Sequence, residues 1–544
     1  MGNLIWEAYE TARDDKPLVH IWDDDGYKPH TWDYWREQSL RVAAGLRRRG
    51  VEPGTRVAAV LTNTADVGCA VIGAWLAGAV LVSLPTPRRG QEPFDYLAQL
   101  QRIWADSQAH VLLIEQRFLT LLGDRDLGIP VAAFDSLAAD GPFEPTPPAD
   151  DEVAFVQYSS GSTKEPSGCM LTMGAISEQE RMIQERLRVD GDTVGVSWLP
   201  FSHDMGLFGS LLLTWVSGMR GWLGSPERFL RQPGTWFEDC AEVGGHLTMG
   251  PSFGLSLAVR RARTRPPQGV IPLRAIILGG ERIEWDTLLE AEEVLGPHGL
   301  TLDTMLPAYG LAEAALAVSM KRIDGRPPTV IHADAPDLYA GRLTPAEAGA
   351  DDSLAVVSCG PPVDGAEVRI EGDGRVGRIC VRSRSLALGY LGDEELTRRS
   401  IVDGELITND LGFLDERGEL HVIGRTDDVI AVGGRNVHAR DAERLVERCE
   451  GVRTGCAALL ELAEPSGARM LLAVEARGEL SGGGVPLAQE AAEAAYRAVG
   501  LRVEECVFLA PGTMPKTPSG KIQRFRCRTM VRDDAEAIVA RVAL

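Results

Sequence analysis

The hydrophobic and polar positions of the first 150 residues follow two alternating periods. Apolar residues recur at helical spacing over 31–50, and Thr31 at the start of this stretch is a typical helix-capping residue. The short apolar run at 57–61 is typical of a buried strand. A second helix and strand follow over 68–84, and a third pair over 96–114. Strands that alternate with helices predict a parallel sheet with crossover helices.

Further along the chain, short apolar runs end in polar or glycine-containing turns. The runs at 153–157 and 276–281 predict buried strands, while 197–207 and 248–254 each predict the start of a helix. We therefore expect an α/β fold in which α/β sheets are packed by helices.

The chain has 544 residues, more than one hydrophobic core usually organises, so we expect at least two domains. From residue 428 on, a glycine-rich loop at 481–484 and an alanine-rich helix at 487–499 indicate a separate α/β domain. The stretch 319–352 is weakly periodic and has little core character, which by itself is typical of a surface loop.

Charge and cysteine usage narrow the class of protein. A formal net charge of -22 argues against nucleic acid or an anionic membrane as partner, because both require a basic surface. The apolar stretch 68–84 is rich in glycine and alanine and breaks before Pro85, so we interpret it as a buried helix and strand rather than a membrane span. The nine cysteines form no C-x-x-C pair, and the N-terminus shows no signal-peptide pattern. These features predict a cytoplasmic protein with reduced thiols and no structural metal.

A loop rich in hydroxyl groups follows the strand at 153–157 and reads YSSGSTKEPSG over 158–168. Small residues let backbone N–H groups turn toward a polyphosphate, the hydroxyls donate further hydrogen bonds, and Lys164 adds a positive charge. The Walker spacing is absent. Taken alone, the loop is more typical of a polar surface turn than of a phosphate site.

Three later segments carry side chains suited to a nucleotide site. Tyr309 offers a flat face for a purine, and the neighbouring Gly310 permits close backbone approach. Glu313 supplies a hard oxygen ligand for Mg²⁺. Asp410, which we expect on a turn, can accept two hydrogen bonds from a ribose diol. Lys521 lies in a proline-flanked segment near the C-terminus.

The order of these segments resembles the adenylate-forming superfamily, which includes acyl-CoA synthetases, luciferases and the adenylation domains of peptide synthetases. The phosphate loop is similar to S-G-S-T-G-x-P-K-G, but Lys164 replaces the glycine after the threonine and Ser167 replaces the lysine. Those two changes agree with the fatty acyl-AMP ligase branch. The run WLPFSHDMGL at 198–207 resembles a segment of the same branch, YGLAE at 309–313 resembles Y-G-[LMT]-A-E, and PKTPSGKIQR at 515–524 resembles P-K-T-x-S-G-K-I-x-R.

The resemblance implies a domain order. Residues 1–424 would form a large N-terminal adenylate-forming domain, with 319–352 as the insertion of acyl-AMP ligases. Residues 425–428 would be a hinge and 429–544 a small mobile α/β lid domain. In the family the insertion is associated with release of acyl-AMP to a carrier protein and with discrimination against CoA.

The resemblance also assigns roles to individual residues. ATP and AMP binding falls to Ser159, Ser160, Gly161, Ser162, Thr163, Lys164, Gly279, Gly280, Glu281, Ala308, Tyr309, Gly310, Leu311, Asp410 and Arg425. The implied catalytic residues are Lys521, His203 and Glu313, with Glu313 also the ligand of Mg²⁺. The acyl pocket falls to Met205, Gly206, Ser252 and Phe253, and the hinge pivot to Asp427. Two departures from the family pattern are Ser252 where asparagine is usual and Asn409 where glycine is usual.

The implied reaction joins a carboxylic acid to ATP, releases pyrophosphate and passes the acyl group to the phosphopantetheine thiol of an acyl carrier protein. The carboxylate is already ionised at pH 7 and needs no general base, so we interpret His203 as a positioning residue. Three alternatives stay open at this point: an acyl-CoA synthetase, a ligase that uses another nucleophile, and a non-catalytic homologue that binds nucleotide or a partner protein. The acid itself, a long alkyl, short or aryl acid, is not readable from the sequence.

Overall fold

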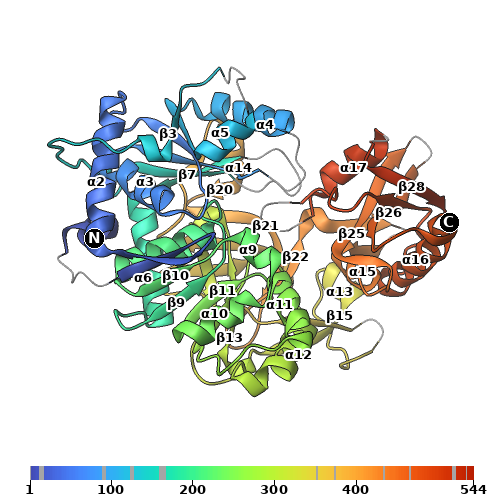
Figure 1. The fold of residues 1–544 in the computed structure, drawn as a ribbon. Coiled ribbons are helices and arrows are strands. Elements are labelled where there is room, and N and C mark those ends of the chain that lie inside the picture. The colour runs from blue at the N-terminus through green and yellow to red at the C-terminus, as the bar shows by residue number, and fades with distance from the viewer. Residues whose placement is uncertain are drawn as a thin grey trace.

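The computed structural model describes residues 2–11, 17–87, 93–122, 128–158, 167–350, 353–372, 375–432, 435–464, 467–516, 522–533 and 536–544. The chain forms a large body and, beside it, a smaller C-terminal lobe (Figure 1). We use "C-terminal lobe" for the described residues from 429 on. None of the described helices has both the length and the apolar character that crossing a bilayer requires.

The first sheet of the large body confirms the parallel sheet with crossover helices. Its strand order is β19 (Gly389–Tyr390), β8 (Gly168–Thr172), β7 (Val153–Tyr158), β4 (Val80–Leu84), β3 (Arg56–Val60), β5 (Val111–Ile114) and β6 (Val131–Ala133). The strands from β7 to β6 are parallel to one another. The helices between them are α3 (Ala65–Leu76), α4 (Pro93–Ser107) and α5 (Gln116–Leu122), and α2 (Trp32–Arg48) precedes β3. As the sequence predicts, Thr31 caps α2, and its hydroxyl oxygen accepts a hydrogen bond from the backbone N–H of Tyr34.

The second sheet carries most of the segments singled out by sequence. Its strand order is β14 (Ala317–Met320), β13 (Met305–Gly310), β12 (Ala275–Leu278), β11 (Leu247–Gly250), β9 (Val194–Ser197), β10 (Arg220–Leu223), β1 (Pro17–Asp23) and β2 (Gly26–Thr31). The five strands from β13 to β10 are parallel, so their carboxyl ends lie at one edge. The helices of this part are α1 (Leu4–Glu10), α6 (Met173–Leu187), α7 (Asp204–Gly206), the π-helix η2 (Leu207–Leu212), α8 (Leu213–Ser217), α9 (Pro226–Arg231), α10 (Thr235–Val243), α11 (Ser252–Thr264) and α12 (Trp285–Leu295).

A tryptophan-rich core holds the helices of the two sheets together. Trp32 and Trp215 stack with their ring centroids 4.0 Å apart, and Trp35 lies beside them without exposed surface. The same cluster of buried side chains includes residues of both sheets, such as Leu81 of β4 and Leu223 of β10. The two sheets are therefore fixed relative to each other by apolar packing.

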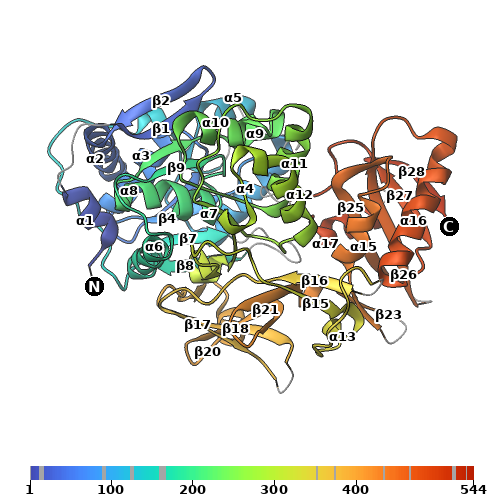
Figure 2. The ribbon, with the colours of Figure 1, turned by 90° about the horizontal axis from the view of Figure 1, so that it is seen from below.

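The rest of the large body is mostly antiparallel. A third sheet contains β17 (Ala366–Ile370), β18 (Gly377–Ser383), β21 (Glu405–Leu414), β20 (Ile401–Val402) and β22 (Leu420–Arg425), and α14 (Glu394–Ser400) precedes β20. The strands β15 (Val330–Asp334) and β16 (Ser353–Val357) form a two-stranded sheet beside α13 (Ala335–Tyr339) (Figure 2).

The stretch 319–352 has more core character than its sequence pattern indicates. Leu338 and Tyr339 of α13 are buried, and they pack with Phe413 of β21 and Ile423 of β22. The expectation of little core character was wrong, because the apolar residues of this stretch are too widely spaced to show a period and are buried by strands that come later in the chain.

The C-terminal lobe has apolar cores of its own. It contains β23 (Val429–Val432), β24 (Arg435–His438), α15 (Ala439–Val446), β25 (Val452–Glu464), β26 (Gly467–Ala476), α16 (Val485–Val499), β27 (Glu505–Leu509), α17 (Arg524–Arg532) and β28 (Ile538–Ala543). Two clusters of buried side chains are drawn entirely from this lobe. The boundaries at 424, 428 and 429 stay a prediction.

Candidate active site

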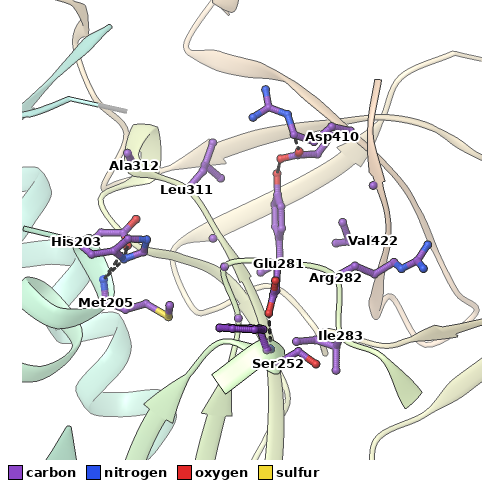
Figure 3. Close-up of a pocket in the computed structure, with 18 of the residues that line it drawn as sticks. His203, Met205, Ser252, Glu281, Arg282, Ile283, Leu311, Ala312, Asp410 and Val422 are labelled. Carbon is purple, nitrogen blue, oxygen red and sulfur yellow. Dashed lines mark hydrogen bonds and ion pairs between the residues drawn. The ribbon is translucent and has the colours of Figure 1, made fainter. Parts of the chain in front are cut away.

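One cavity of about 1250 Å³ lies at the carboxyl edge of the second sheet and extends to the C-terminal lobe. Ser252 follows β11, Gly280 follows β12, and Tyr309 is the penultimate residue of β13, so three neighbouring parallel strands deliver residues to it. Figure 3 shows His203 and Met205 on one side of this cavity, Val422 and Arg282 on the other, and Asp410 at the top. Ligands of open α/β sheets bind in this position, outside the carboxyl ends of the strands.

The polar end of the cavity is organised around Asp410. Its Oδ2 accepts a hydrogen bond of 2.6 Å from the Tyr309 hydroxyl, and its Oδ1 lies 4.0 Å from Nε of Arg425. Burial and the adjacent carboxylate raise the pKa of Tyr309 well above its ordinary value, so the phenol stays protonated and donates. Asp410 lies within β21 and pairs with Arg425 of β22. The expectation of a turn at Asp410 was wrong, because residues on both sides of it continue the strand.

Glu313 lies on a short 3₁₀ turn directly after β13 and lines the same cavity. Its Oε1 accepts a hydrogen bond of 2.7 Å from the hydroxyl of Tyr390, which β19 supplies from the first sheet. This bond fixes the direction of the carboxylate. Among the described residues no group of three or more His, Cys, Asp or Glu side chains is arranged as a metal site.

His203 caps the short helix α7 at the end of the segment after β9. Its Nδ1 lies 2.5 Å from Oδ1 of Asp204 and 3.4 Å from the backbone nitrogen of Met205. The imidazole is thereby held at the cavity wall, where it can position a substrate.

Two glycines that line the cavity, Gly280 and Gly310, are required at their positions for steric reasons. Gly280 adopts φ +80°, which favours glycine. A Cβ on Gly310 would fall 1.8 Å from the carbonyl oxygen of Leu316. Glycine is therefore required here because the backbone of residue 316 passes close by, whether or not a ligand is bound. Next to Gly280, Oε1 of Glu281 accepts a hydrogen bond of 2.6 Å from the backbone N–H of Phe253 at the start of α11.

The other end of the cavity is apolar. Met205, Met249, Ile277 and Leu316 line this part together with Ile183 of α6. Leu187, Gly209, Ala317 and Met320 also line it. A cavity with charged groups at one end and aliphatic groups at the other is suited to an amphipathic ligand.

The C-terminal lobe closes one side of the cavity and is held by a buried ion pair. Nη2 of Arg282 lies 2.7 Å from Oδ1 of Asp441 on α15, and the other oxygen of Asp441 accepts a hydrogen bond from the hydroxyl of Tyr339 on α13. Burial alone would raise the pKa of Asp441, but Arg282, His438 and the Tyr339 hydroxyl hold it below its ordinary value. The carboxylate is therefore charged and joins three parts of the chain.

Most of the residues proposed from sequence meet in this one cavity. Those that line it are His203, Met205, Ser252, Phe253, Gly279, Gly280, Glu281, Ala308, Tyr309, Gly310, Leu311, Glu313, Asp410 and Arg425. Gly206 does not, because its Cα faces the carbonyl of Pro200, where a Cβ would fall 2.0 Å from the oxygen. The residues Ser159, Ser160, Gly161, Ser162, Thr163, Lys164 and Lys521 lie outside the described residues. For Asp427 only the backbone, in a 3₁₀ turn, is described.

Sequence reasoning missed several groups at this site. Tyr390 and Tyr339 belong to no recognisable motif. Arg282 directly follows the Gly279-Gly280-Glu281 turn, but its partner Asp441 is 159 positions away in the chain. Basic residues of the C-terminal lobe also line the cavity, among them Arg440, Arg444 and Arg526. They supply part of the positive charge that a net acidic protein needs around an anionic ligand.

The family described as "AMP-binding enzyme" matches residues 6–391, well over half of the sequence. The chain belongs to this family. It is also similar to a 4-hydroxyphenylalkanoate adenylyltransferase of Mycobacterium marinum, at 31% identity over 92% of this chain and 86% of the relative. A long-chain-fatty-acid–AMP ligase of Mycobacterium tuberculosis is 29% identical over 98% of this chain and 97% of the relative.

A solved structure extends the likeness to three dimensions. The fatty acyl-adenylate ligase from L. pneumophila, in complex with acyl adenylate and pyrophosphate, is 26% identical with a TM-score of 0.74, covering 99% of this chain and 97% of that chain. The resemblance to the fatty acyl-AMP ligase branch of the adenylate-forming superfamily is thus confirmed, as are the α/β fold class and the expectation of an acid-adenylating enzyme.

Proposed function

We propose that this AMP-binding enzyme converts a fatty or related carboxylic acid to acyl-AMP and then transfers the acyl group to the phosphopantetheine thiol of an acyl carrier protein. The observation that carries the proposal is the continuity of one cavity from Asp410 and Arg425 at its polar end to Ile183 at its apolar end. An acyl adenylate needs both environments in contact, because its nucleotide is polar and its acyl chain is not. The names of the relatives and the acyl adenylate of the solved structure support this assignment.

In the first step the acid carboxylate attacks the α-phosphorus of ATP, a P–O bond forms to the acid, and the bond to pyrophosphate breaks. We assign Asp410 to the ribose hydroxyls, because one of its oxygens already faces Arg425 and the other is held by Tyr309. The ring of Tyr309 takes the adenine face, and Gly279, Gly280, Glu281, Ala308, Gly310 and Leu311 complete the nucleotide wall. His203 orients the acid at the junction between the polar and apolar ends. These groups act by positioning, which supplies much of the rate in phosphoryl-group chemistry.

Glu313 fits Mg²⁺ bound together with ATP. Proteins commonly hold this ion through one or two carboxylates while substrate phosphates complete its coordination, so a single well-oriented carboxylate suffices. When bound, Mg²⁺ neutralises charge on the phosphate oxygens. The role of Tyr390 is to hold the Glu313 carboxylate toward the cavity. The phosphate loop with Lys164, and the lysine Lys521, are assigned to phosphate and carboxylate by the resemblance alone.

Two features favour a carrier protein over free CoA as acceptor. α13, within the stretch 319–352, contacts β24 of the C-terminal lobe, and Tyr339 of α13 donates to Asp441. The second feature is the ion pair between Arg282 and Asp441, which joins the lobe to the edge of the nucleotide wall. An anchored lobe restricts the rotation that opens a path for free CoA, while a carrier protein brings its own binding surface.

All nine cysteines are free and buried, which supports a reducing compartment such as the cytoplasm.

The test measures both half-reactions. Purified protein is incubated with Mg²⁺, ATP and a panel of alkyl and aryl acids, and acid-dependent pyrophosphate release is recorded. The same mixtures then receive either CoA or a holo acyl carrier protein, and the thioesters are separated by mass. We expect acyl-AMP in the absence of acceptor and acyl-carrier in its presence.

Each alternative has its own signature in this test. Acyl-CoA formed at a rate comparable to acyl-carrier would assign the chain to the acyl-CoA synthetases. Acyl-AMP that reaches neither thiol would indicate a different nucleophile. No pyrophosphate release with any acid would overturn the enzymatic proposal and favour a nucleotide-binding homologue.

A further inference from the structure

The helical segment that begins after His203 contributes a glycine to the cavity wall. Gly209 lies in the π-helix η2 and lines the cavity, as do His203 and Met205 earlier in the same segment. The backbone N–H of Leu207, the first residue of η2, donates a hydrogen bond of 2.9 Å to the carbonyl oxygen of His203, so η2 continues directly from the residue assigned to orient the acid. A π-helical turn is rare and is frequently found at a functional site.

Two side chains of the apolar end face this glycine. Met249 of β11 and Leu316, directly before β14, both line the cavity. A Cβ on Gly209 would fall 2.7 Å from Sδ and 3.1 Å from Cε of Met249, and 3.2 Å from Cδ2 of Leu316. These distances are shorter than the separation of about 3.5–4.0 Å that packed carbon atoms prefer. The Met249 side chain can therefore lie against η2 only because residue 209 has no Cβ.

A side chain at position 209 would displace Met249 or Leu316. Both pack in one cluster of apolar side chains, whose close packing leaves no room for a displaced group, whereas the cavity beside them does. Methionine has three rotatable side-chain bonds and readily adopts another conformation. The displaced side chain would thus turn into the cavity and narrow its apolar end.

We propose that Gly209 is a specificity-determining residue of the acid site. By leaving room for Met249 against η2, it keeps the apolar end wide enough for an acid with a bulky hydrocarbon part, either a long alkyl chain or a chain that ends in an aryl ring. A short acid occupies little of this space, so a narrower cavity would cost it little. The inference rests on the proposed function and names the part of the wall that decides which acids enter.

The experiment compares acids of increasing bulk. Pyrophosphate release is measured with butanoic, octanoic, dodecanoic, hexadecanoic and phenylpropanoic acids, and kcat/KM for the best acid is divided by kcat/KM for butanoic acid. We expect the wild-type chain to favour the bulkier acid and Gly209→Ala to lower this ratio by about ten- to a hundredfold. The loss should lie mainly in the KM for the acid, because the added methyl removes binding space and no group that acts on the reacting atoms.

Two further variants separate specificity from packing. In Gly209→Ala combined with Met249→Ala, the side chain that the new methyl meets is absent, so we expect most of the ratio to be restored. Gly195→Ala is the matched control, because a Cβ there would also overlap a methionine side chain, that of Met219, but neither residue lines the cavity. This control should leave the ratio as in the wild type. Thermal unfolding of each variant records its stability separately, since a glycine needed only for packing would lower Tm without changing the ratio.

The outcomes are distinct. A ratio unchanged in Gly209→Ala, or a wild-type chain that prefers butanoic acid, would overturn the inference and leave the proposed adenylation intact. Should Gly209→Ala fail to fold, Met249→Phe narrows the same place from the opposite wall, and an unchanged ratio there would count equally against the inference. Adenylation of no acid at all by the wild-type chain would overturn the proposed function and, with it, the inference.

Discussion

The hydroxyl of Tyr309 lies 2.6 Å from Oδ2 of Asp410, although the two residues are 101 positions apart in the chain. This bond joins the end of a parallel strand in the second sheet to a strand of the antiparallel third sheet. It leaves the carboxylate oriented in the cavity, with its second oxygen toward Arg425.

We predict that Asp410→Asn weakens ATP use. The amide has only one acceptor oxygen and carries no charge, so it cannot serve both the ribose diol and Tyr309. A hydrogen bond to a charged group contributes about 1.5–3 kcal/mol, which corresponds to a rise in the KM for ATP of roughly ten- to a hundredfold. The KM for ATP is measured from steady-state pyrophosphate release at varied ATP concentrations. Glu416→Gln, an exposed change on the same hairpin, is the control, and an unaltered KM in Asp410→Asn would contradict the ribose assignment.

Glu313→Gln should raise the Mg²⁺ concentration needed for half-maximal rate and lower kcat by about a hundredfold, because an amide is a weaker ligand for a hard cation. Tyr390→Phe should have a smaller effect, about tenfold, since it removes only the bond that orients the carboxylate. Measuring pyrophosphate release across a Mg²⁺ titration separates the effects of these two variants. Tyr496→Phe, exposed on α16, is the matched control. Equal Mg²⁺ dependence in wild type and Glu313→Gln would remove Glu313 from the metal site.

Lys521→Ala is expected to lower the rate of ATP–pyrophosphate exchange by roughly 10²- to 10³-fold, by analogy with the loss of one preorganised donor. Lys521 lies outside the described residues, so this prediction depends on the segment's resemblance to P-K-T-x-S-G-K-I-x-R. Lys516 belongs to the same segment and lies 5.9 Å from the Phe253 ring centroid. Lys516→Ala is therefore a control for general disturbance of the segment. Near-normal exchange by Lys521→Ala protein would refute the role.

The sequence predicted the parts of the site that belong to single short segments. Gly280 and Tyr309 directly follow or end apolar strands, and parallel strands bring their carboxyl ends together whatever the rest of the chain does. The pairs that orient the site could not be predicted in this way. Tyr390 and Glu313 come from different sheets, and Tyr339 reaches Asp441 across 102 positions.

Glu180, a fully buried residue of α6, is an intermediate case. Its segment, GAISEQERMIQERL, looks like an ordinary amphipathic helix with several surface glutamates. A helical projection would have placed Glu180, unlike Glu185, in line with Ile176 and Ile183. The signal was present in the spacing, but only the surrounding sheets show that this face is buried along its whole length.

The lobe contact at Asp441 gives a test of domain docking. Asp441→Asn would leave the buried guanidinium of Arg282 with Glu284 as its one carboxylate partner among the described residues, and removing one member of a buried pair costs about 3–5 kcal/mol. We expect the lobe to undock, with a larger radius of gyration in small-angle scattering and more acyl-CoA formed relative to acyl-carrier. Asp286→Asn breaks exposed pairs with Arg444 and Arg448, which are worth at most about 1 kcal/mol, and should change neither measurement. An unchanged radius in Asp441→Asn would show that the pair does not hold the lobe.

Glu180→Gln should stabilise the chain, and by an amount that grows with pH. The pKa of Glu180 is raised in the folded chain and stays near 4.3 in the unfolded chain. The unfolded chain therefore releases this proton first, and the contribution of Glu180 to stability, full below about pH 4.3, is lost as pH rises toward the folded pKa. Glutamine does not titrate, so the advantage of the variant should increase by up to about 1.4 kcal/mol per pH unit in this window. Thermal unfolding of both proteins between pH 5 and pH 8 measures the difference, with Glu185→Gln as the exposed control. A Tm difference that stays constant over this range would mean that Glu180 is charged in the folded chain, as it would be beside a bound cation or well-ordered water.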